Sequence, residues 1–513
     1  MSSNASLLPE SREELENIID SLTTKNEQLE AKVRWFEEQF HLTRHKQFGA
    51  SSERSIKQQP NLFNEAEAIA EAGPVEETIC QTITYERKKP GRRPIPKDLP
   101  MERIEYRLTE EERVCKTCDG LMHEMSEEIR HEVKLVPAQV KIVQHVRIVY
   151  GCRDCEKNSI EVPIKTAKAP RPVIEKGLAS PSAIAYVMTM KFVDGVPLYR
   201  QEQHYARLGI DLSRGVLSNW MLKGSEWLEL IYPRLKQKLL EQEVLHADET
   251  TLQVLKELGR PAESQSYMWL YRTGSLGPPI VLYEYQQTRS GEHPRNFLKG
   301  FKGYLHADGY AGYHDIPDVT LCGCWAHLRR KYSEALKGLP PKKRSSGSRA
   351  QEALDRINRL FAIERELKRC TPEERLELRN LKSRPIVEEF RKWLDNILPG
   401  VLPKSLFGLA VNYGRNQWAK LVRFLEDGRV ELDNNRAERS IKPFVISRKN
   451  FLFCNTPCGA RASATIFSII ESAKENRLNP YSYLNYLFEK LPNLDSRDDA
   501  TLDQLLPWNV KLQ

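Results

Sequence analysis

A phrase of four residues, Leu-His-Ala-Asp, occurs twice in this chain, at positions 245–248 and 305–308. Each copy follows an apolar run and ends in an aspartate, Asp248 or Asp308, as a buried strand does when it carries an acid at its exposed end. If the two strands are neighbours, their carboxylates lie close together, and like charges that close require a cation between them. Because Mg²⁺ prefers oxygen ligands and suits phosphoryl transfer, the repeat predicts a magnesium site.

A third acid is expected in the segment 433–443, which has the pattern of a helix start. Asp433 or Asn434 would be the N-cap, and Glu438 and Lys442 are four residues apart, on one helical face. Lys442 would either neutralise a phosphate or pair with this glutamate, and the sequence favours neither.

The chain carries these motifs in order: Leu-His-Ala-Asp-Glu-Thr (245–250), Ala-Asp-Gly-Tyr-Ala-Gly-Tyr (307–313), Cys-Trp-Ala-His-Leu-Arg-Arg-Lys (324–331) and Asp-Asn-Asn-Arg-Ala-Glu-Arg (433–439). In them, and from the first helix nearly to the C-terminus, the chain resembles bacterial transposases of the insertion sequence 66 type. These are Asp-Asp-Glu recombinases with an RNase H-like core. The resemblance implies that Asp248, Asp308 and Glu438 are catalytic and hold two Mg²⁺ or Mn²⁺ ions. It also implies a helical insertion between Asp308 and Glu438. Within that insertion, Thr371 followed by Pro372 and two acids has the pattern of a capped helix start.

The pattern from residue 243 onward predicts a sheet followed by a helix. The expected strands are 244–247, 266–272, 280–285, 303–307 and 319–324. His327, in the helix that follows, would lie at the edge of the site or simply pack, whereas Cys322 and Cys324 are expected in the core. Glu249 is expected at the surface more than in support of Asp248.

Two Cys-x-x-Cys pairs give the strongest metal signal in the chain. They are Cys115 with Cys118 and Cys152 with Cys155. Two such pairs complete a tetrahedral site for one structural Zn²⁺, and strands at 129–136 and 140–150 would form a hairpin that brings them together. A thioredoxin-like redox pair is the disfavoured alternative. We expect the zinc to hold a DNA-binding ribbon together and to take no part in the chemistry.

The N-terminal segment has a heptad seam with one polar position, Asn26. The apolar seam residues are Leu15, Ile19, Leu22, Leu29, Val33, Phe36 and Phe40. An Asn in such a seam typically fixes the register of a two-stranded coiled coil, so the pattern predicts a homodimer, or a larger synaptic assembly built from it. The alternative is an amphipathic helix that packs on its own domain, because the seam is short.

Basic residues are candidates for contacts with double-stranded DNA, at the ends of the element and in the target. The expected contacts are Arg87, Lys88, Lys89, Arg92 and Arg93 in a Pro/Gly linker, Arg329 and Arg330 after the last strand, and Lys442, Arg448 and Lys449. The linker is as readily explained as a solvated segment. Helices at 199–208 and 213–222, the second capped by Ser213, have the proportions of a helix-turn-helix, although packing is the preferred role.

Composition sets the broad class of the protein. The chain has 513 residues, 29% of them charged, and a formal net charge of +8, which permits a nucleic-acid partner without requiring one. It has no apolar run of about 18 residues and no basic-then-apolar leader, so no membrane partner is expected. The scattered remaining cysteines fit a reducing compartment. We expect a cytoplasmic bacterial protein associated with the nucleoid.

The overall prediction is an α/β multidomain protein with an RNase H-like catalytic core. Its expected parts are a coiled-coil helix (1–50), a basic linker (51–100), a zinc-binding domain (101–165), a helix-turn-helix-like domain (170–235), a catalytic domain (240–450) with a helical insertion (335–400), and a C-terminal helical region (451–513). The polar tail from residue 495 is expected to be loose. It would be a DNA transposase that frees 3′-hydroxyls at element ends and joins them to target DNA, with small accessory proteins of the same element as partners. The alternatives are an inactive zinc-containing dimeric DNA-binding protein and an RNase H-like nuclease that cuts without joining.

Overall fold

The computed structural model describes residues 139–151, 164–339 and 347–512, and single helical positions between residues 19 and 36. The four zinc-ligand candidates and the basic linker lie outside the described residues. At the described seam positions, Ile19, Leu22, Leu29, Val33 and Phe36 are exposed in the single chain. The dimeric coiled coil stays a prediction. Within the described ranges, no helix has the length and apolar character needed to span a membrane.

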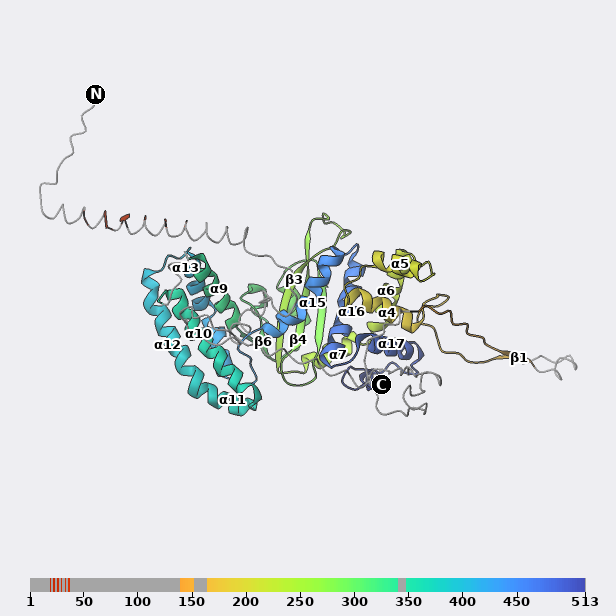
Figure 1. Cartoon of the computed structure of the whole chain (residues 1–513). Helices are drawn as coiled ribbons and strands as arrows, with labels where there is room; N and C mark the ends of the chain where they lie inside the picture. Colours follow the sequence, from red (N-terminus) through yellow and green to blue (C-terminus); the bar gives the residue numbers. More distant parts are fainter. Residues whose placement is uncertain are drawn as a thin grey trace, which may run out of the picture. The chain divides into compact units, whose positions relative to one another are not determined.

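A mixed five-stranded sheet forms the centre of the molecule, with strand order β5-β4-β3-β6-β7 (Figure 1). The strands are β3 (Val244–Gln253), β4 (Gln265–Thr273), β5 (Val281–Gln286), β6 (Gly303–His306) and β7 (Val319–Cys322). β4 runs antiparallel to both of its neighbours, β3 and β5, whereas β6 and β7 are parallel to β3. Each of the five strands predicted from residue 243 onward is therefore present, in a topology that places the two copies of the repeat side by side.

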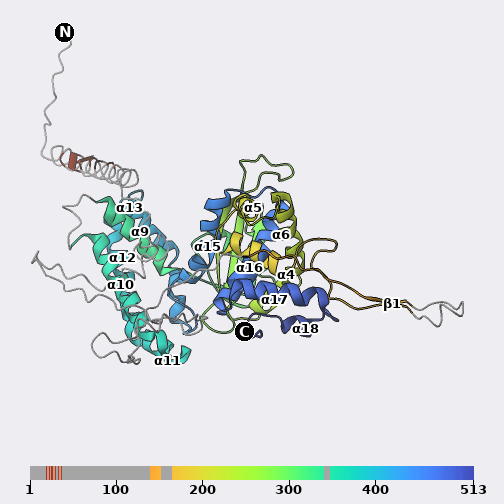
Figure 2. The ribbon, with the colours of Figure 1, turned by 45° about the vertical axis from the view of Figure 1, so that its right-hand side comes forward.

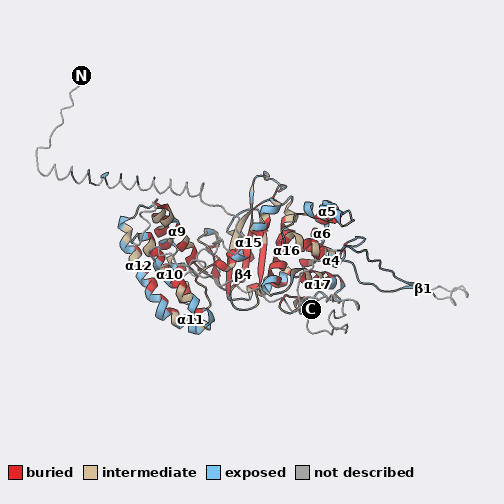
Figure 3. Ribbon diagram, in the orientation of Figure 1, coloured by how far each residue is buried: buried red, intermediate tan, exposed pale blue. Residues whose placement is uncertain are grey.

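Helices cover the sheet because its strands are apolar on both faces. β4 is buried at nearly every position, and Figure 3 shows β4 and α16 (Pro457–Glu475) buried. α15 (Asn435–Phe451) packs across β3 and β4, and α16 packs on β5 (Figure 2). Serines of α16 bind the edge of the sheet: the hydroxyl of Ser468 accepts the N–H of Tyr283 at 2.8 Å. The helix that carries Glu438 is thus fixed directly on the strand that carries Asp248.

Between residue 164 and the sheet, the described chain forms four helices. They are α4 (Pro181–Phe192), α5 (Leu198–Arg207), α6 (Arg214–Leu228) and α7 (Tyr232–Leu240). The predicted cap is confirmed, since the Ser213 hydroxyl accepts the N–H of Val216. One face of α6 is buried against α4 and α16. Its other face keeps Ser218 and Asn219 exposed, while Arg214 pairs with Glu202 at 3.5 Å.

A helical segment with its own core lies between β7 and α15. Its helices are α9 (Trp325–Gly338), α10 (Arg349–Glu366), α11 (Pro372–Leu378), α12 (Arg384–Ile397), α13 (Leu406–Asn416) and α14 (Trp418–Leu421). Trp325 and Phe390 are among the large side chains of this core. The expected start of α11 is confirmed, because Thr371 and Glu374 form a reciprocal capping box.

Three local expectations are wrong. β3 continues to Gln253, so Asp248 lies within the strand and not at its end. Residues 140–148 are not a strand; only β1 (Val149–Gly151) forms, paired with β2 (Ile164–Thr166). The tail after residue 495 is not loose, because α17 (Pro480–Lys490) is followed by α18 (Asp499–Asp503) and Asp503 binds the buried Arg234 at 2.8 Å. Long-range packing, which leaves no local pattern, causes the last difference.

Candidate active site

Parallel pairing of β3 and β6 brings the two aspartates together. His246 is the register partner of His306, so Asp248 and Asp308 each lie two residues beyond a matched pair. The Asp248 Oδ1 accepts the N–H of Glu249 at 2.9 Å, and the Asp308 Oδ1 accepts the N–H of Tyr310 at 2.8 Å. These backbone bonds fix the carboxylate of Asp248 within β3 and that of Asp308 just after the end of β6, the neighbouring strand.

Glu438 reaches the same place from the first turn of α15. Its side chain is buried, with 2% of the residue exposed. Its Oε2 accepts a hydrogen bond from Arg330 Nη2 at 3.2 Å. Its Oε1 lies 3.6 Å from His327 Nδ1, and neither of these two atoms has a hydrogen-bond partner among the residues the structure describes. His327 therefore lies at the edge of the site, which is one of the two positions expected for it.

The three acids act on one another electrostatically. Burial raises the pKa of Asp248 well above its usual value, and the charges of Glu249, Glu438 and Asp308 raise it further. Burial also raises the pKa of Glu438 to about 7; Arg330 opposes this increase and Asp308 adds to it. Carboxylates in this situation lose their protons readily only when a cation replaces them.

Several potential metal-ligand atoms lie in this region. Glu438 offers an unpartnered buried oxygen, and Asp248 keeps part of its surface open to solvent. Among the described residues, Cys324, His327 and Glu438 place one potential ligand atom each within 4.8 Å of one another. Burial raises the pKa of the Cys324 thiol, which disfavours it as a ligand. Asp248, Asp308 and Glu438 offer the oxygen ligands that Mg²⁺ and Mn²⁺ prefer, but the three do not all place an oxygen within 4.8 Å of one another.

Glu249 supports the site, contrary to its expected surface role. Its side chain is 2% exposed, Arg289 Nε donates to its Oε1 at 2.9 Å, and the Tyr313 hydroxyl donates to its Oε2 at 2.5 Å. The Arg289 guanidinium also lies 3.9 Å from the centre of the Tyr310 ring. Glu249 thereby links β3 to the turn that holds Asp308. In the sequence, only its position beside Asp248 pointed to this role, because the residues that bind Glu249 are distant along the chain.

The basic candidates occupy different positions. Arg329 is buried and donates to Asn358 Oδ1 at 2.7 Å, which argues against a phosphate contact. Adjacent residues of a helix face different directions, so Arg329 and Arg330 have different surroundings. Arg330 faces Glu438. Arg448 is half-buried and donates to the Thr251 hydroxyl of β3 at 2.9 Å, whereas Lys449 is exposed. Lys442, one turn after Glu438, is half-buried.

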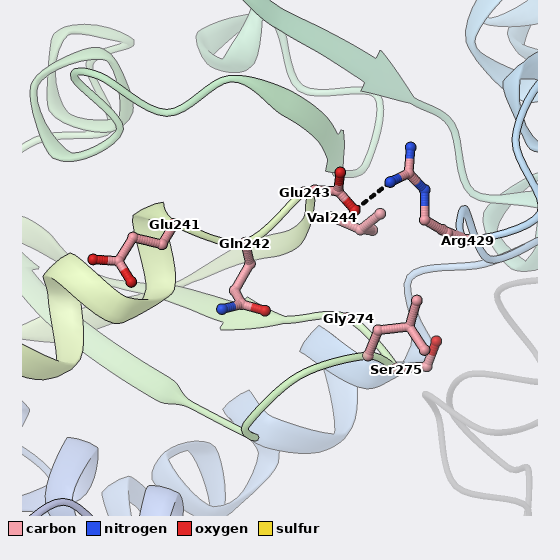
Figure 4. A pocket seen from close by; sticks show the side chains of 8 residues that line it. Glu241, Gln242, Glu243, Val244, Gly274, Ser275 and Arg429 are labelled. Carbon is pink, nitrogen blue, oxygen red and sulfur yellow. Dashed lines mark hydrogen bonds and ion pairs between the residues drawn. The ribbon is translucent and has the colours of Figure 1, made fainter.

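A pocket of about 210 Å³ lies at the other end of β3, where the strand begins (Figure 4). Glu243, Val244, Gly274 and Arg429 are among its lining residues, and Glu243 and Arg429 form an ion pair. None of the three acids lines it. The catalytic candidates are therefore outside this cavity.

Comparison with known proteins identifies the family. A family model described as "Transposase IS66 family" matches residues 176–462, a span that contains all three acids and the helical insertion. The chain belongs to the IS66 transposase family. Its match to the IS66 zinc-finger binding domain covers residues 112–156, which include all four predicted zinc ligands. Further matches are to the IS66 C-terminal element at 468–508 and to "Transposase C of IS166 homeodomain" at 35–104, which contains the basic linker.

Two proteins of Sinorhizobium fredii are similar to this IS66 family member over most of their length. The uncharacterized protein y4jD is 31% identical over 431 residues, which cover 81% of this chain and 81% of y4jD. The uncharacterized protein y4qI is 31% identical over 443 residues, which cover 82% of this chain and 79% of y4qI. The zinc-finger and transposase domains of the family imply that DNA is a partner of this chain.

Proposed function

We propose that this chain is a DNA transposase that cleaves the ends of its insertion sequence and joins the freed 3′-hydroxyls to target DNA. The observation that carries the proposal is electrostatic: Asp308, which follows β6, raises the pKa of both Asp248 in β3 and Glu438 in α15, so the three acids belong to one region. The strand order and the positions of these acids support an RNase H-like core.

The chemistry divides between the acids and their neighbours. Two divalent ions, when bound, would activate the attacking hydroxyl and stabilise charge on the leaving oxygen. Asp248 and Asp308 would hold them from the sheet, and Glu438 from the opposite side, through its unpartnered Oε1. Arg330 orients the glutamate by binding Oε2. Glu249, with Arg289 and Tyr313, would hold the strand and the Asp308 turn in register.

Two successive displacements account for cleavage and joining. In the first, water attacks a phosphodiester at the element end and a 3′-hydroxyl leaves. In the second, that hydroxyl attacks a phosphodiester of the target, whose own 3′-oxygen leaves. No covalent intermediate with the protein forms, so no serine, tyrosine or cysteine nucleophile is needed.

The proposal extends to binding. Arg330, Lys442, Arg448 and Lys449 would contact DNA near the acids, and the linker cations and the zinc ribbon would contact the element ends. The assembly would be a coiled-coil dimer or a larger synaptic complex in the bacterial cytoplasm, with accessory proteins of the element.

A strand-transfer assay with the full chain, labelled element ends, a target plasmid and Mg²⁺ tests the proposal. We expect cleavage and joining by the native chain and neither by Asp248→Asn, Asp308→Asn or Glu438→Gln, with end binding retained. Glu334→Gln removes an exposed carboxylate of α9 and serves as the matched control. Cleavage without joining would instead support a nuclease. End binding without cleavage by the native chain, also after its accessory proteins are added, would support an inactive binding protein.

A further inference from the structure

Asn434 occupies the N-cap position of α15, but its side chain does not cap the helix. An asparagine at this position ordinarily accepts an N–H group from the first turn. Here the neighbouring Asp433 Oδ1 accepts the N–H of Asn435 at 2.9 Å. Asn434 is 1% exposed, so its amide must find its partners inside the protein.

Both ends of the Asn434 amide are bound to β3. Its Nδ2 donates to the carbonyl oxygen of Ala247 at 2.8 Å, and its Oδ1 lies 2.9 Å from His246 Nδ1. Because Nδ2 is the donor, Oδ1 must accept, and His246 Nδ1 carries the proton. The backbone N–H of Asn434 donates to Cys324 Sγ at 3.2 Å.

These bonds connect two of the acids by a short path. Ala247 directly precedes Asp248 in β3. The carbonyl of Asn434 accepts the N–H of Glu438 at 3.2 Å, in the first turn of α15. A displacement of Asn434 relative to β3 would therefore change the separation between the Asp248 and Glu438 carboxylates.

The second copy of the repeat joins the same network. The His306 ring stacks on the His246 ring, with centroids 4.9 Å apart and planes within 11°. His306 Nε2 lies 2.7 Å from the carbonyl oxygen of Glu431, three residues before Asn434. His306 is two residues before Asp308. The two histidines of the repeat thus attach the segment leading into α15 to both acid-bearing strands.

We propose that His246, His306 and Asn434 are positioning residues that set the distance of Glu438 from Asp248 and Asp308, and thereby the affinity of the site for divalent ions. The inference rests on the proposed function, because it assumes that the three acids bind the ions together. None of the three positioning residues needs to touch the ions or DNA. The role explains why histidine precedes the aspartate by two residues in both copies.

Two substitutions of His246 separate the hydrogen bond from packing. In His246→Asn, the side-chain amide places a donor near the position of Nδ1, whereas in His246→Gln the amide reaches the position of Nε2. Both remove the ring stack with His306. We expect Mn²⁺ affinity, measured by calorimetry on the zinc-loaded full chain without DNA, to fall by about tenfold or more in His246→Gln and in Asn434→Ala. His246→Asn should keep most of the native affinity.

Further measurements make the result decisive. Tyr483→Phe removes a buried hydroxyl that donates to the Leu505 carbonyl at 2.7 Å, far along the chain, and controls for a general loss of stability. Its urea midpoint should fall while its Mn²⁺ affinity does not. Equal losses of affinity in His246→Asn and His246→Gln, or no loss in either, would overturn the proposal. Should His246→Gln not fold, Asn434→Ala takes its place in the comparison.

The failures of the two proposals are distinguishable. If Asp248→Asn and Asp308→Asn bind Mn²⁺ as the native chain does, the acids are not the metal site and the proposed function fails together with this inference. If those two variants lose Mn²⁺ but the His246 pair does not differ, only the positioning role fails.

Discussion

Glu438 has two carboxylate oxygens in different surroundings. Arg330 binds one of them, while the other is buried and faces His327 and Cys324. At the residue scale, the site is therefore a set of charges held in place before a cation arrives. Such an arrangement favours metal binding and works against the stability of the metal-free protein.

Asp248→Asn should stabilise the protein in EDTA by about 1 kcal/mol, because it removes one of several close like charges and keeps the oxygen that accepts the Glu249 N–H. The pKa of Asp248 is raised in the folded state, so the native chain loses stability as pH rises above the usual carboxyl pKa. The difference in unfolding free energy between the variant and the native chain should therefore grow as pH rises. Urea unfolding at several pH values measures it. A lower midpoint for the variant in EDTA would contradict the argument.

Metal binding should release protons. The pKa of Glu438 is raised to about 7 by burial, so below that pH a divalent ion must displace a proton from it. We expect Mn²⁺ affinity to rise by up to about tenfold per pH unit for each proton released as pH increases toward 7, and to level off above it. Calorimetry in buffers of different ionisation enthalpy gives both the affinity and the proton count. An affinity that stays constant across this range would show that the acids are already ionised.

At the scale of elements, the position of α15 is set by buried polar groups as well as by apolar packing. Arg272 of β4 donates to the Ser440 hydroxyl of α15 at 2.6 Å, and Asn434 binds β3 at the other end of the contact. Hydrophobic burial alone permits a helix to slide or rotate, whereas paired donors and acceptors in a low-dielectric interior specify one position. The catalytic geometry depends on that position.

Arg379 ties the helical insertion to the segment before α15. It is fully buried, pairs with Glu364 at 2.6 Å, and donates to the Phe424 and Val430 carbonyls, each at 2.8 Å. Arg379→Leu should cost about 3–5 kcal/mol of unfolding free energy, because it leaves a carboxylate and carbonyls unpaired. Arg379→Lys should recover little, since lysine lacks the planar fork.

Urea unfolding checks both substitutions of Arg379. Arg384→Leu, at an exposed position of α12, is the matched control and should change stability by less than about 1 kcal/mol. A full recovery by Arg379→Lys would mean that charge alone, without the geometry of the guanidinium, holds the segment.

At the scale of the whole molecule, the IS66 match divides the chain into parts that bind DNA and a part that carries the acids. The zinc-finger match and the transposase match cover separate residues, 112–156 and 176–462. We expect a substitution that disrupts the zinc-finger region to leave the acid-bearing region intact, because the acids are held by the sheet and its helices.

Cys118→Ser should remove the bound zinc. Binding to element ends should then weaken by tenfold or more, because the structural metal site that holds the zinc finger is lost. Mn²⁺ binding at the acids should be kept. Zinc content by mass spectrometry, a gel-shift assay and calorimetry measure the three quantities in one preparation. Cys370→Ser, at a half-buried cysteine outside the pairs, is the control. Loss of Mn²⁺ binding together with zinc would show that the two parts depend on each other.

The sequence by itself determined much of the core and the candidate site. The repeat at 245–248 and 305–308, the strand pattern and the cap at Thr371 are local signals, because each depends on neighbours along the chain. The resemblance to the insertion sequence 66 transposases supplied the third acid and the insertion, and the family match confirms that relationship.

Only the tertiary structure decided how far β3 extends, which way Arg329 and Glu249 face, and that Asn434 binds β3 instead of capping its own helix. In each case the deciding partner is remote: the bonds of Asn434 to His246 and Ala247 span 188 and 187 residues. A buried polar group must find a partner wherever packing provides one, and the local pattern of residues contains no record of which segment that will be.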